Sequence, residues 1–309
     1  MIMPAFNPNS EFGPWAKTDI SPSKLKQFNE CPKKFFYKYV RREKTHNGLA
    51  NLQGLSLHEI SLEEYMGGGV QDIDALVDLI AMDFESRCET GDPRDWNTKE
   101  PCDKADIMQA TEQLKVWAKG FLDALKSGKD PYGEPFNLPD VKATEVELCK
   151  ELELKDGTKL RIRGFADFVF DDESLGDLKL ASDYWRAVWT EARALGELQP
   201  VMYAKMHGTD TFRYVIVDKK KARTGDAYSP NVRVIEVKLD QKHFDRLLDD
   251  LEYFVQSTDL LNDYENGYFP CRPIYGGETK AKAGMTEKNF CDQMCSFKEI
   301  CYKENFAMS

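Results

Sequence analysis

Hydrophobic residues recur along this chain with two different periods, and each period predicts a different kind of secondary structure. In the first part of the chain the spacing is close to that of an α-helix. Ser21-Pro-Ser is a typical helix start there, and Gly67-Gly68-Gly69 is a typical stop. We expect helices over residues 21–42, with an interruption at Cys31-Pro32, and over about 52–66, 72–88 and 104–126.

From about residue 142 apolar and polar residues alternate, which is typical of half-buried strands. Two alternating runs, 144–154 and 159–170, are separated by Asp156-Gly157, a strong signal for a hairpin turn. Further strands are expected at about 175–181, 211–218 and 231–238, with helices at about 184–207 and 240–264. This order favours an α/β or α+β fold with a mixed sheet and helical segments around it.

The composition is that of a folded protein. Of 309 residues, 41% are apolar and 12% aromatic, enough for a sizeable core. After a loose arm over 1–20, residues 21–309 are expected to form a single domain. Its parts would be a helical part (21–140), a sheet core (141–240) and a C-terminal helix with a cysteine-rich tail (241–309).

Targeting signals are not expected in this sequence. No apolar run reaches the length of a membrane span, and the N-terminus lacks the pattern of a secretory signal. We therefore expect a cytoplasmic protein without a membrane partner. Because such a compartment is reducing, the eight cysteines are interpreted as metal ligands or buried thiols rather than disulfides. The formal net charge of -11 argues at first sight against a nucleic-acid partner.

Two carboxylates and a lysine form the most informative pattern. Asp167 ends the segment Gly164-Phe165-Ala166-Asp167 on one expected strand, and Asp177 and Lys179 lie on the next. Residues two apart on a strand share a face, and a tight turn would bring Asp167 beside the other two. Paired carboxylates bind hard divalent cations, and a nearby lysine can act on a water or offset charge on a phosphate. A salt bridge on an exposed hairpin is the alternative interpretation.

Three further residues carry little meaning singly. His58 lies on the second expected helix, where a histidine is more often structural than a ligand. Gln199 and Tyr203 are four residues apart and therefore share a helix face.

In order, however, Gly54-x3-His58, Gly164-x2-Asp167, Asp177-x-Lys179 and Gln199-x3-Tyr203 resemble the motif series of RecB-type nucleases in the PD-(D/E)XK superfamily. The segment from Ser21 to Tyr37 also resembles the start of such domains. The resemblance spans residues 21–301. It implies an α/β, restriction-endonuclease-like core and a DNA exonuclease that processes ends for recombination, repair or replication.

The resemblance also implies roles for single residues. His58, Asp167 and Asp177 would bind Mg²⁺ or Mn²⁺, with the carbonyl of Leu178 as a possible further ligand. Lys179 would act on the attacking water, and Gln199 and Tyr203 would arrange the site or the DNA strand. Ala166 stands where other branches have proline. Glu145 and Glu147 are interpreted as surface residues or as residues behind the ligands.

The cysteine-rich tail ends in Cys291-x3-Cys295-x5-Cys301, three thiols that need a fourth ligand for an iron–sulfur cluster or tetrahedral zinc. The resemblance extends to AddB-type and CRISPR-adaptation nucleases, in which a cysteine before the core joins three after it. It implies that Cys31 completes a structural 4Fe-4S cluster. The first gap is three residues rather than the usual two, so Cys271 as the fourth ligand and zinc as the metal stay open.

Basic residues concentrate near the N-terminus. Lys33, Lys34, Arg41 and Arg42 lie among aromatic residues and are candidates for contacts with DNA, and a solvated helix face is the equal alternative. Net charge does not say where charge lies, so the acidic surplus does not exclude DNA. Without a Walker-type phosphate loop the chain is not itself a helicase, although a helicase or recombinase partner is possible. The alternative functions are a non-catalytic metal-bearing scaffold and a structure-specific endonuclease.

Overall fold

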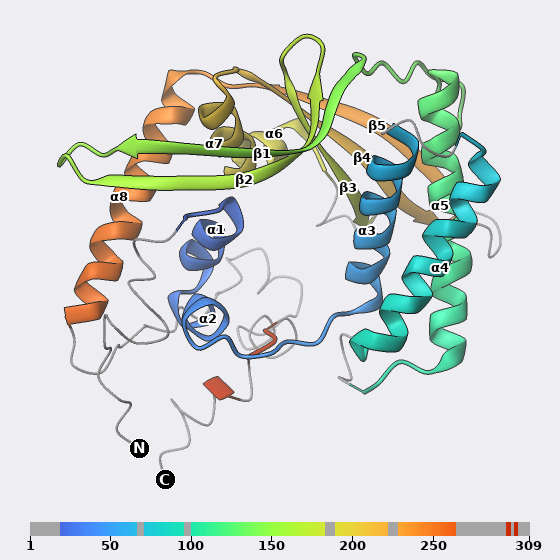
Figure 1. The fold of residues 1–309 in the computed structure, drawn as a ribbon, viewed down its shortest axis with the longest axis horizontal. Coiled ribbons are helices and arrows are strands. Elements are labelled where there is room, and N and C mark those ends of the chain that lie inside the picture. Colours follow the sequence, from blue (N-terminus) through green and yellow to red (C-terminus); the bar gives the residue numbers. More distant parts are fainter. Residues whose placement is uncertain are drawn as a thin grey trace, which may run out of the picture. The chain divides into compact units, whose positions relative to one another are not determined.

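The computed structural model in Figure 1 describes residues 19–66, 71–95, 100–182, 189–221, 228–263, 295–297 and 300–301. The chain divides into two compact units. The first comprises residues 1–46, 149–164 and 242–309, and the second comprises 47–148 and 165–241. The prediction of one domain over 21–309 stays a prediction. Within the described ranges, no helix has both the length and the apolar character that crossing a membrane requires.

The first unit begins with short helices. Helix α1 (Pro22–Glu30) starts where the side chain of Ser21 accepts a hydrogen bond from the amide of Lys24, at 3.3 Å. Cys31 is extended because the following proline disfavours a helical residue before it. The chain then forms α2 (Pro32–Phe35) and a π-helical turn η2 (Phe36–Val40). The predicted interruption at Cys31-Pro32 is confirmed.

Aromatic rings form the core of this unit. The ring of Phe254, on helix α8 (Gln241–Asp263), lies 4.9 Å from that of Phe28 and 5.7 Å from that of Phe35. Tyr37 contacts Phe297 at 5.5 Å between ring centroids, which brings the C-terminal segment to the N-terminal helices. Burial of such rings is the largest single source of stability that small cores have.

The second unit contains the longer helices. They are α3 (Leu49–Ile60) with a π-helical turn η3 (Ser61–Met66), α4 (Ile73–Gly91), α5 (Lys104–Ser127), α6 (Glu191–Gly196) and α7 (Leu198–His207). Helix α5 starts with a capping box in which Asp103 and Asp106 each accept a hydrogen bond from the other's backbone amide. The expected helices over 52–66, 72–88 and 104–126 are confirmed within a few residues.

One mixed sheet contains the five strands β1 (Val141–Glu153), β2 (Lys159–Phe170), β3 (Leu175–Ser182), β4 (Thr211–Lys221) and β5 (Tyr228–Lys238). Their spatial order is β1-β2-β3-β4-β5. Strands β3 and β4 are parallel, whereas β2–β3 and β4–β5 are antiparallel. The α/β fold with a mixed sheet flanked by helices is therefore confirmed.

Helices cover both faces of the sheet (Figure 1). On β4, Val215 and Val217 belong to the core that the sheet shares with α3, α4 and α5. The neighbouring positions point the other way, as alternation in a strand requires. There Phe212 contacts Tyr203 of α7 at 6.3 Å between ring centroids. The sheet is thus held between two helical layers, with Asp167, Asp177 and Lys179 on its strands.

The expected helix over 184–207 needs a correction. Among the described residues it is two helices, α6 and α7, separated at Glu197, whose backbone is extended. Pro200 lies in the first turn of α7, where its missing N–H costs nothing. In a continuous helix the ring of Pro200 would meet the carbonyl of Gly196 one turn earlier, so the helix ends and starts again.

Candidate functional site

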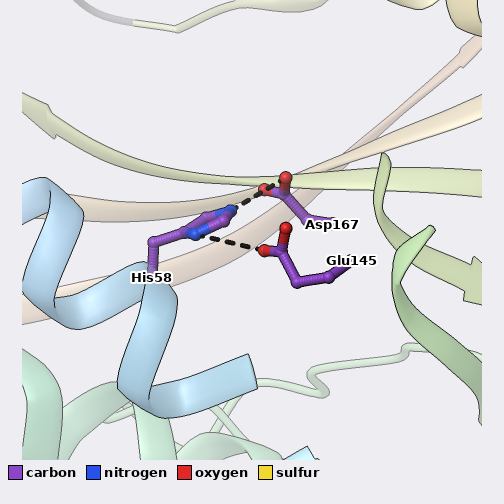
Figure 2. A group of neighbouring side chains, drawn as sticks. All are labelled: His58, Glu145 and Asp167. Atoms are coloured by element: carbon purple, nitrogen blue, oxygen red, sulfur yellow. Dashed lines mark ion pairs between the residues drawn. The ribbon is translucent and has the colours of Figure 1, made fainter. Parts of the chain in front are cut away.

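A histidine and two carboxylates meet in the second unit. Nε2 of His58, on α3, lies 2.8 Å from Oδ1 of Asp167 on β2. Nδ1 of the same ring lies 3.4 Å from Oε1 of Glu145 on β1. Figure 2 shows each ring nitrogen facing its own carboxylate, with the two carboxylates close to one another. One ligand atom from each residue lies within 4.8 Å of the others, a spacing that suits a metal ion.

The second aspartate is joined to this group through the backbone. The amide of Leu178 donates a hydrogen bond of 2.6 Å to Oδ2 of Asp167, which fixes β2 against β3 at this point. Asp177 precedes Leu178, and its Oδ2 lies 2.6 Å from Nζ of Lys179. This contact pairs the ammonium of Lys179 with a buried carboxylate oxygen.

Helix α7 adds two polar side chains to the site. The side-chain amide of Gln199 donates to Oδ1 of Asp177. Gln199 also contacts the hydroxyl of Tyr203, which is hydrogen-bonded to the backbone of Phe165 as well. Four of the sequence-predicted residues, Asp177, Lys179, Gln199 and Tyr203, therefore form one connected group.

Burial gives this group an unusual charge balance. Asp177 is 2% exposed, and burial together with the charge of Asp167 raises its pKa to about 6. Burial lowers the pKa of Lys179, but the charge and hydrogen bond of Asp177, together with the charges of Asp167 and Glu197, raise it overall. Burial likewise lowers the pKa of His58, and Asp167, Glu145 and Asp177 together raise it. The site holds more negative charge than its lysine balances, as a cation site requires.

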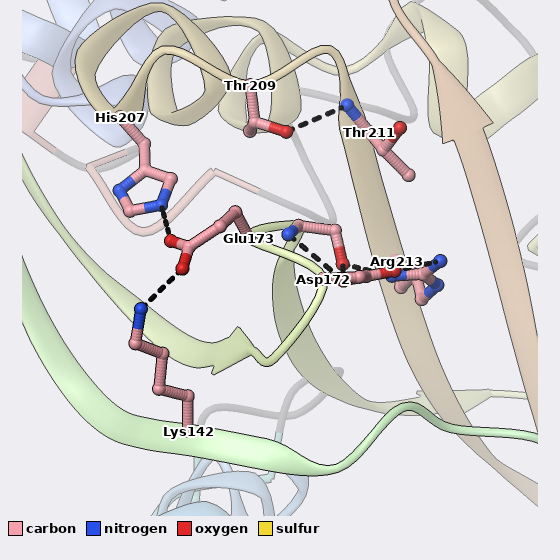
Figure 3. A network of polar contacts seen from close by, with 8 residues as sticks. Lys142, Asp172, Glu173, His207, Thr209, Thr211 and Arg213 are labelled. Atoms are coloured by element: carbon pink, nitrogen blue, oxygen red, sulfur yellow. Dashed lines mark hydrogen bonds and ion pairs between the residues drawn. The ribbon is translucent and has the colours of Figure 1, made fainter.

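A polar network lies on the turn that connects β2 and β3 (Figure 3). Glu173 in this turn pairs with Lys142 of β1 and lies 3.6 Å from Nε2 of His207, the last residue of α7. Arg213 of β4 pairs with Asp172 at 2.9 Å. Burial raises the pKa of Asp172, but bonds from Ser174 and Arg213 lower it to about 2. The network fixes the turn and helix that place Asp167, Asp177 and Gln199.

Comparison with known families agrees with this geometry. The PD-(D/E)XK nuclease superfamily matches residues 19–302 of this sequence. The chain belongs to the PD-(D/E)XK nuclease superfamily. Enzymes of this superfamily use divalent metals, and the histidine–carboxylate group is a possible metal site. This protein is therefore a nuclease by family, and the predicted superfamily is confirmed.

Solved structures show more distant similarity. A proposed exonuclease from Eubacterium rectale is 15% identical and has a TM-score of 0.43, with 92% of this chain and 94% of that one covered. LHK-Exo, solved in complex with dAMP, is 12% identical with a TM-score of 0.26, and 76% of this chain and 96% of that one are covered. No curated protein matches the sequence.

The predicted cluster cysteines of this nuclease lie only partly within the described residues. Cys31 is buried, Cys295 and Cys301 are half-buried, and none of the described cysteines forms a disulfide. The backbone amide of Cys301 donates to the carbonyl of Phe297, whose ring contacts Tyr37. Cys291, and Cys271 as the alternative to Cys31, lie outside the described residues.

The four basic candidates lie in the first unit. Lys33 is 5% exposed, with its ammonium over the rings of Phe36 and Tyr37 at 5.3 and 5.2 Å. Its charge is thus held inside the protein, which the sequence pattern did not indicate. Lys34 lies 3.7 Å from Glu30, and Arg41 pairs with Glu43 at 2.5 Å. Arg42 has a left-handed backbone with φ of 54°.

Glu145 joins the site through the histidine. The sequence leaves it as a surface residue or one behind the ligands, and the structure places its carboxylate against Nδ1 of His58. Its backbone has a φ of 51°, a left-handed conformation that is rare for glutamate in a strand. Alternation along β1 carries no signal of such a residue. The only hint was its position one strand before Asp167.

Proposed function

We propose that this protein is a metal-dependent DNA exonuclease of RecB/AddB type. One observation carries the proposal: His58, Asp167, Asp177 and Lys179, from one helix and two strands, meet at one point of the second unit. The motif order of the sequence supports the RecB type. DNA is the substrate class that the superfamily suggests, and processing of ends for recombination, repair or replication is the role that we infer.

The residues present fit a hard divalent cation. His58, Asp167 and Asp177 would hold Mg²⁺ or Mn²⁺, with the carbonyl of Leu178 as a further ligand. An imidazole nitrogen and carboxylate oxygens are donors that such an ion takes, and Oδ2 of Asp177 is buried there with the ammonium of Lys179 as its counter-charge. Such an ion supplies Lewis acidity to a phosphoryl oxygen and lowers the pKa of a bound water.

Lys179 provides a fixed positive charge beside this site. Because its pKa is raised, it is an ammonium at neutral pH. It can therefore orient a water through its N–H groups and offset charge that develops on a phosphate. Gln199 holds Asp177 from α7, and Tyr203 holds Gln199, so both residues act by keeping the carboxylate in place.

The cysteines support a structural 4Fe-4S cluster, with zinc as the alternative. The contact of Tyr37 with Phe297 joins the segment that starts at Cys31 to the segment that contains Cys295 and Cys301. Cys31, Cys295 and Cys301 in these connected segments are a suitable start for a four-thiolate site. Cys291 would complete the set. The cluster would join Cys31 to the C-terminal cysteines and so close a long loop of the chain. The free energy of metal binding would then add to the free energy of folding.

Lys34, Arg41 and Arg42 are the basic residues that we propose for contacts with the DNA backbone. Lys34 lies on α2, and Arg41 and Arg42 directly follow η2, in a segment rich in aromatic rings, which suits phosphate contact and base stacking. Lys33 is a weaker candidate, because its ammonium is buried over two rings. A helicase or recombinase that delivers DNA ends is a compatible partner.

The test is a nuclease assay on paired substrates. Linear end-labelled DNA and closed circular DNA would be incubated with Mg²⁺ or Mn²⁺, using wild type, Lys179→Met and the exposed-lysine control Lys126→Met. We expect wild type and the control to degrade linear DNA alone, and only with metal. Cleavage of the circle would favour the endonuclease alternative. Equal activity of wild type and Lys179→Met would favour a non-catalytic scaffold.

A further inference from the structure

Each ring nitrogen of His58 faces a different carboxylate. Nε2 lies 2.8 Å from Oδ1 of Asp167, a proposed metal ligand, and Nδ1 lies 3.4 Å from Oε1 of Glu145 (Figure 2). A metal-binding imidazole offers one nitrogen to the metal and keeps a proton on the other. That second N–H is usually donated to a carboxylate or carbonyl, which fixes both ring orientation and proton position. Glu145 has the place of this acceptor.

The backbone of Glu145 directs its side chain toward the histidine. With φ at 51°, Glu145 departs from the extended conformation of the rest of β1. A left-handed backbone is strained in a residue with a Cβ, because the Cβ crowds the following carbonyl oxygen. Strand β1 is therefore strained at Glu145, whose carboxylate lies against Nδ1 of His58.

The surroundings of Glu145 are those of a residue close to other acids. The charges of Asp167, Glu63 and Glu59 act on its carboxylate, and His58 is the basic group that it contacts. Without the imidazole, this carboxylate would face other carboxylates.

We propose that Glu145 is a positioning residue that accepts the Nδ1–H of His58 and so presents Nε2 to the divalent cation. The proposal rests on the proposed function, because it assumes that His58 binds metal. Glu145 acts through His58 and is not itself a ligand. A direct ligand role would require its negative charge, whereas the positioning role requires only an oxygen that accepts a hydrogen bond.

Metal affinity separates these roles without any nuclease assay. Mn²⁺ binding would be measured by calorimetry for wild type, Glu145→Ala, Glu145→Gln, His58→Ala and the double variant Glu145→Ala/His58→Ala. Glu147→Ala, two residues along β1, is the matched control. We expect Glu145→Ala to weaken Mn²⁺ binding about 10–100-fold. The amide oxygen of Glu145→Gln should restore affinity to within a few-fold of wild type.

The double variant gives the sharpest result. If Glu145 acts through His58, then its removal costs nothing further once His58 is alanine, so the two losses are not additive. Additive losses, or a Gln variant as weak as the Ala variant, would overturn the positioning role alone. Wild-type protein that binds no Mn²⁺ would overturn the metal site and this role with it. Thermal unfolding of each variant identifies any loss of affinity that comes from misfolding.

Discussion

Nζ of Lys179 lies 2.6 Å from Oδ2 of Asp177, and both side chains are on the face of β3 that carries the site. This pairing keeps the lysine charged, since the pKa of its ammonium is raised. The ammonium of Lys179 also partly neutralises the carboxylate of Asp177, which weakens the attraction of that carboxylate for a metal ion. Lys179 and the cation are therefore competitors for Asp177 as well as partners in the proposed reaction.

Replacement of Lys179 by methionine should separate catalysis from metal binding. We expect the cleavage rate to fall by roughly 10²–10⁴-fold, because a charge fixed beside the phosphate is lost. Mn²⁺ affinity should stay equal or increase, because Asp177 loses its competing ammonium. Calorimetry beside a cleavage assay checks this. A parallel loss of metal affinity would show that Lys179 maintains the metal site instead.

In the metal-free protein, ionised Asp177 should lower the free energy of unfolding at pH values above the pKa of its carboxyl group. Burial, then the charge of Asp167, raises this pKa from 3.8 to about 6. Between pH 4 and 6 the folded state binds a proton that the unfolded state does not, so this group adds stability as the pH falls. Above pH 6 both states are ionised, and the cost of the buried charge is fully present.

Asp177→Asn removes that charge. We expect the variant to be more stable than wild type in EDTA at pH 7.5, by about 1–3 kcal/mol. The difference should shrink as the pH falls from 6 to 4. Urea unfolding across this range measures it. A wild type that is the more stable protein at pH 7.5 would contradict the raised pKa.

Tyr203 should act by hydrogen bonding and not by proton transfer. Burial and the charge of Asp177 raise the pKa of its hydroxyl to about 12, so it stays protonated at any working pH. Tyr203→Phe should slow cleavage by roughly two- to tenfold, the worth of one hydrogen bond. The pH–rate profile should keep its shape between pH 6 and 9. Loss of an alkaline limb in the variant would instead identify Tyr203 as a catalytic acid.

Gly176 should be required for the packing below the site. A Cβ at this position would lie 2.7 Å from Cε2 of Phe170, whose ring is fully buried and stacks on Phe168. Gly176→Ala should therefore destabilise the protein by about 1–3 kcal/mol through overpacking. Gly196→Ala is the matched control, because nothing lies within 4 Å of its Cβ. Equal melting temperatures for the two variants would contradict this packing argument.

The proposed 4Fe-4S cluster should make the protein coloured. Anaerobically purified wild type should absorb visible light as 4Fe-4S proteins do, and Cys31→Ala should lose the colour and melt at lower temperature. Cys88→Ala is the control, since this buried thiol of α4 has its pKa raised to about 11 by burial. A colourless wild type with one zinc per chain would identify zinc as the metal.

Most element positions could be predicted from local sequence. The run 159–170 became β2 with the same limits, and the Asp156-Gly157 turn has the left-handed glycine, with φ of 82°, that a tight turn needs. Alternation and helical spacing are short-range patterns, so neighbouring residues suffice to set them. Helical spacing alone does not predict the break at Glu197, because the break comes from the effect of Pro200 on the preceding turn.

What the sequence by itself determined is the succession of helices and strands and the motif order that indicates the superfamily. Which side chains meet was decided by the tertiary structure. The contact of Glu145 with His58 involves a residue with a left-handed backbone. Lys33 is buried because its ammonium packs over two aromatic rings. The pKa of Asp177 is raised because water is excluded from its carboxylate. Contacts, burial and charge balance depend on residues far apart in the chain, and no local pattern contains them.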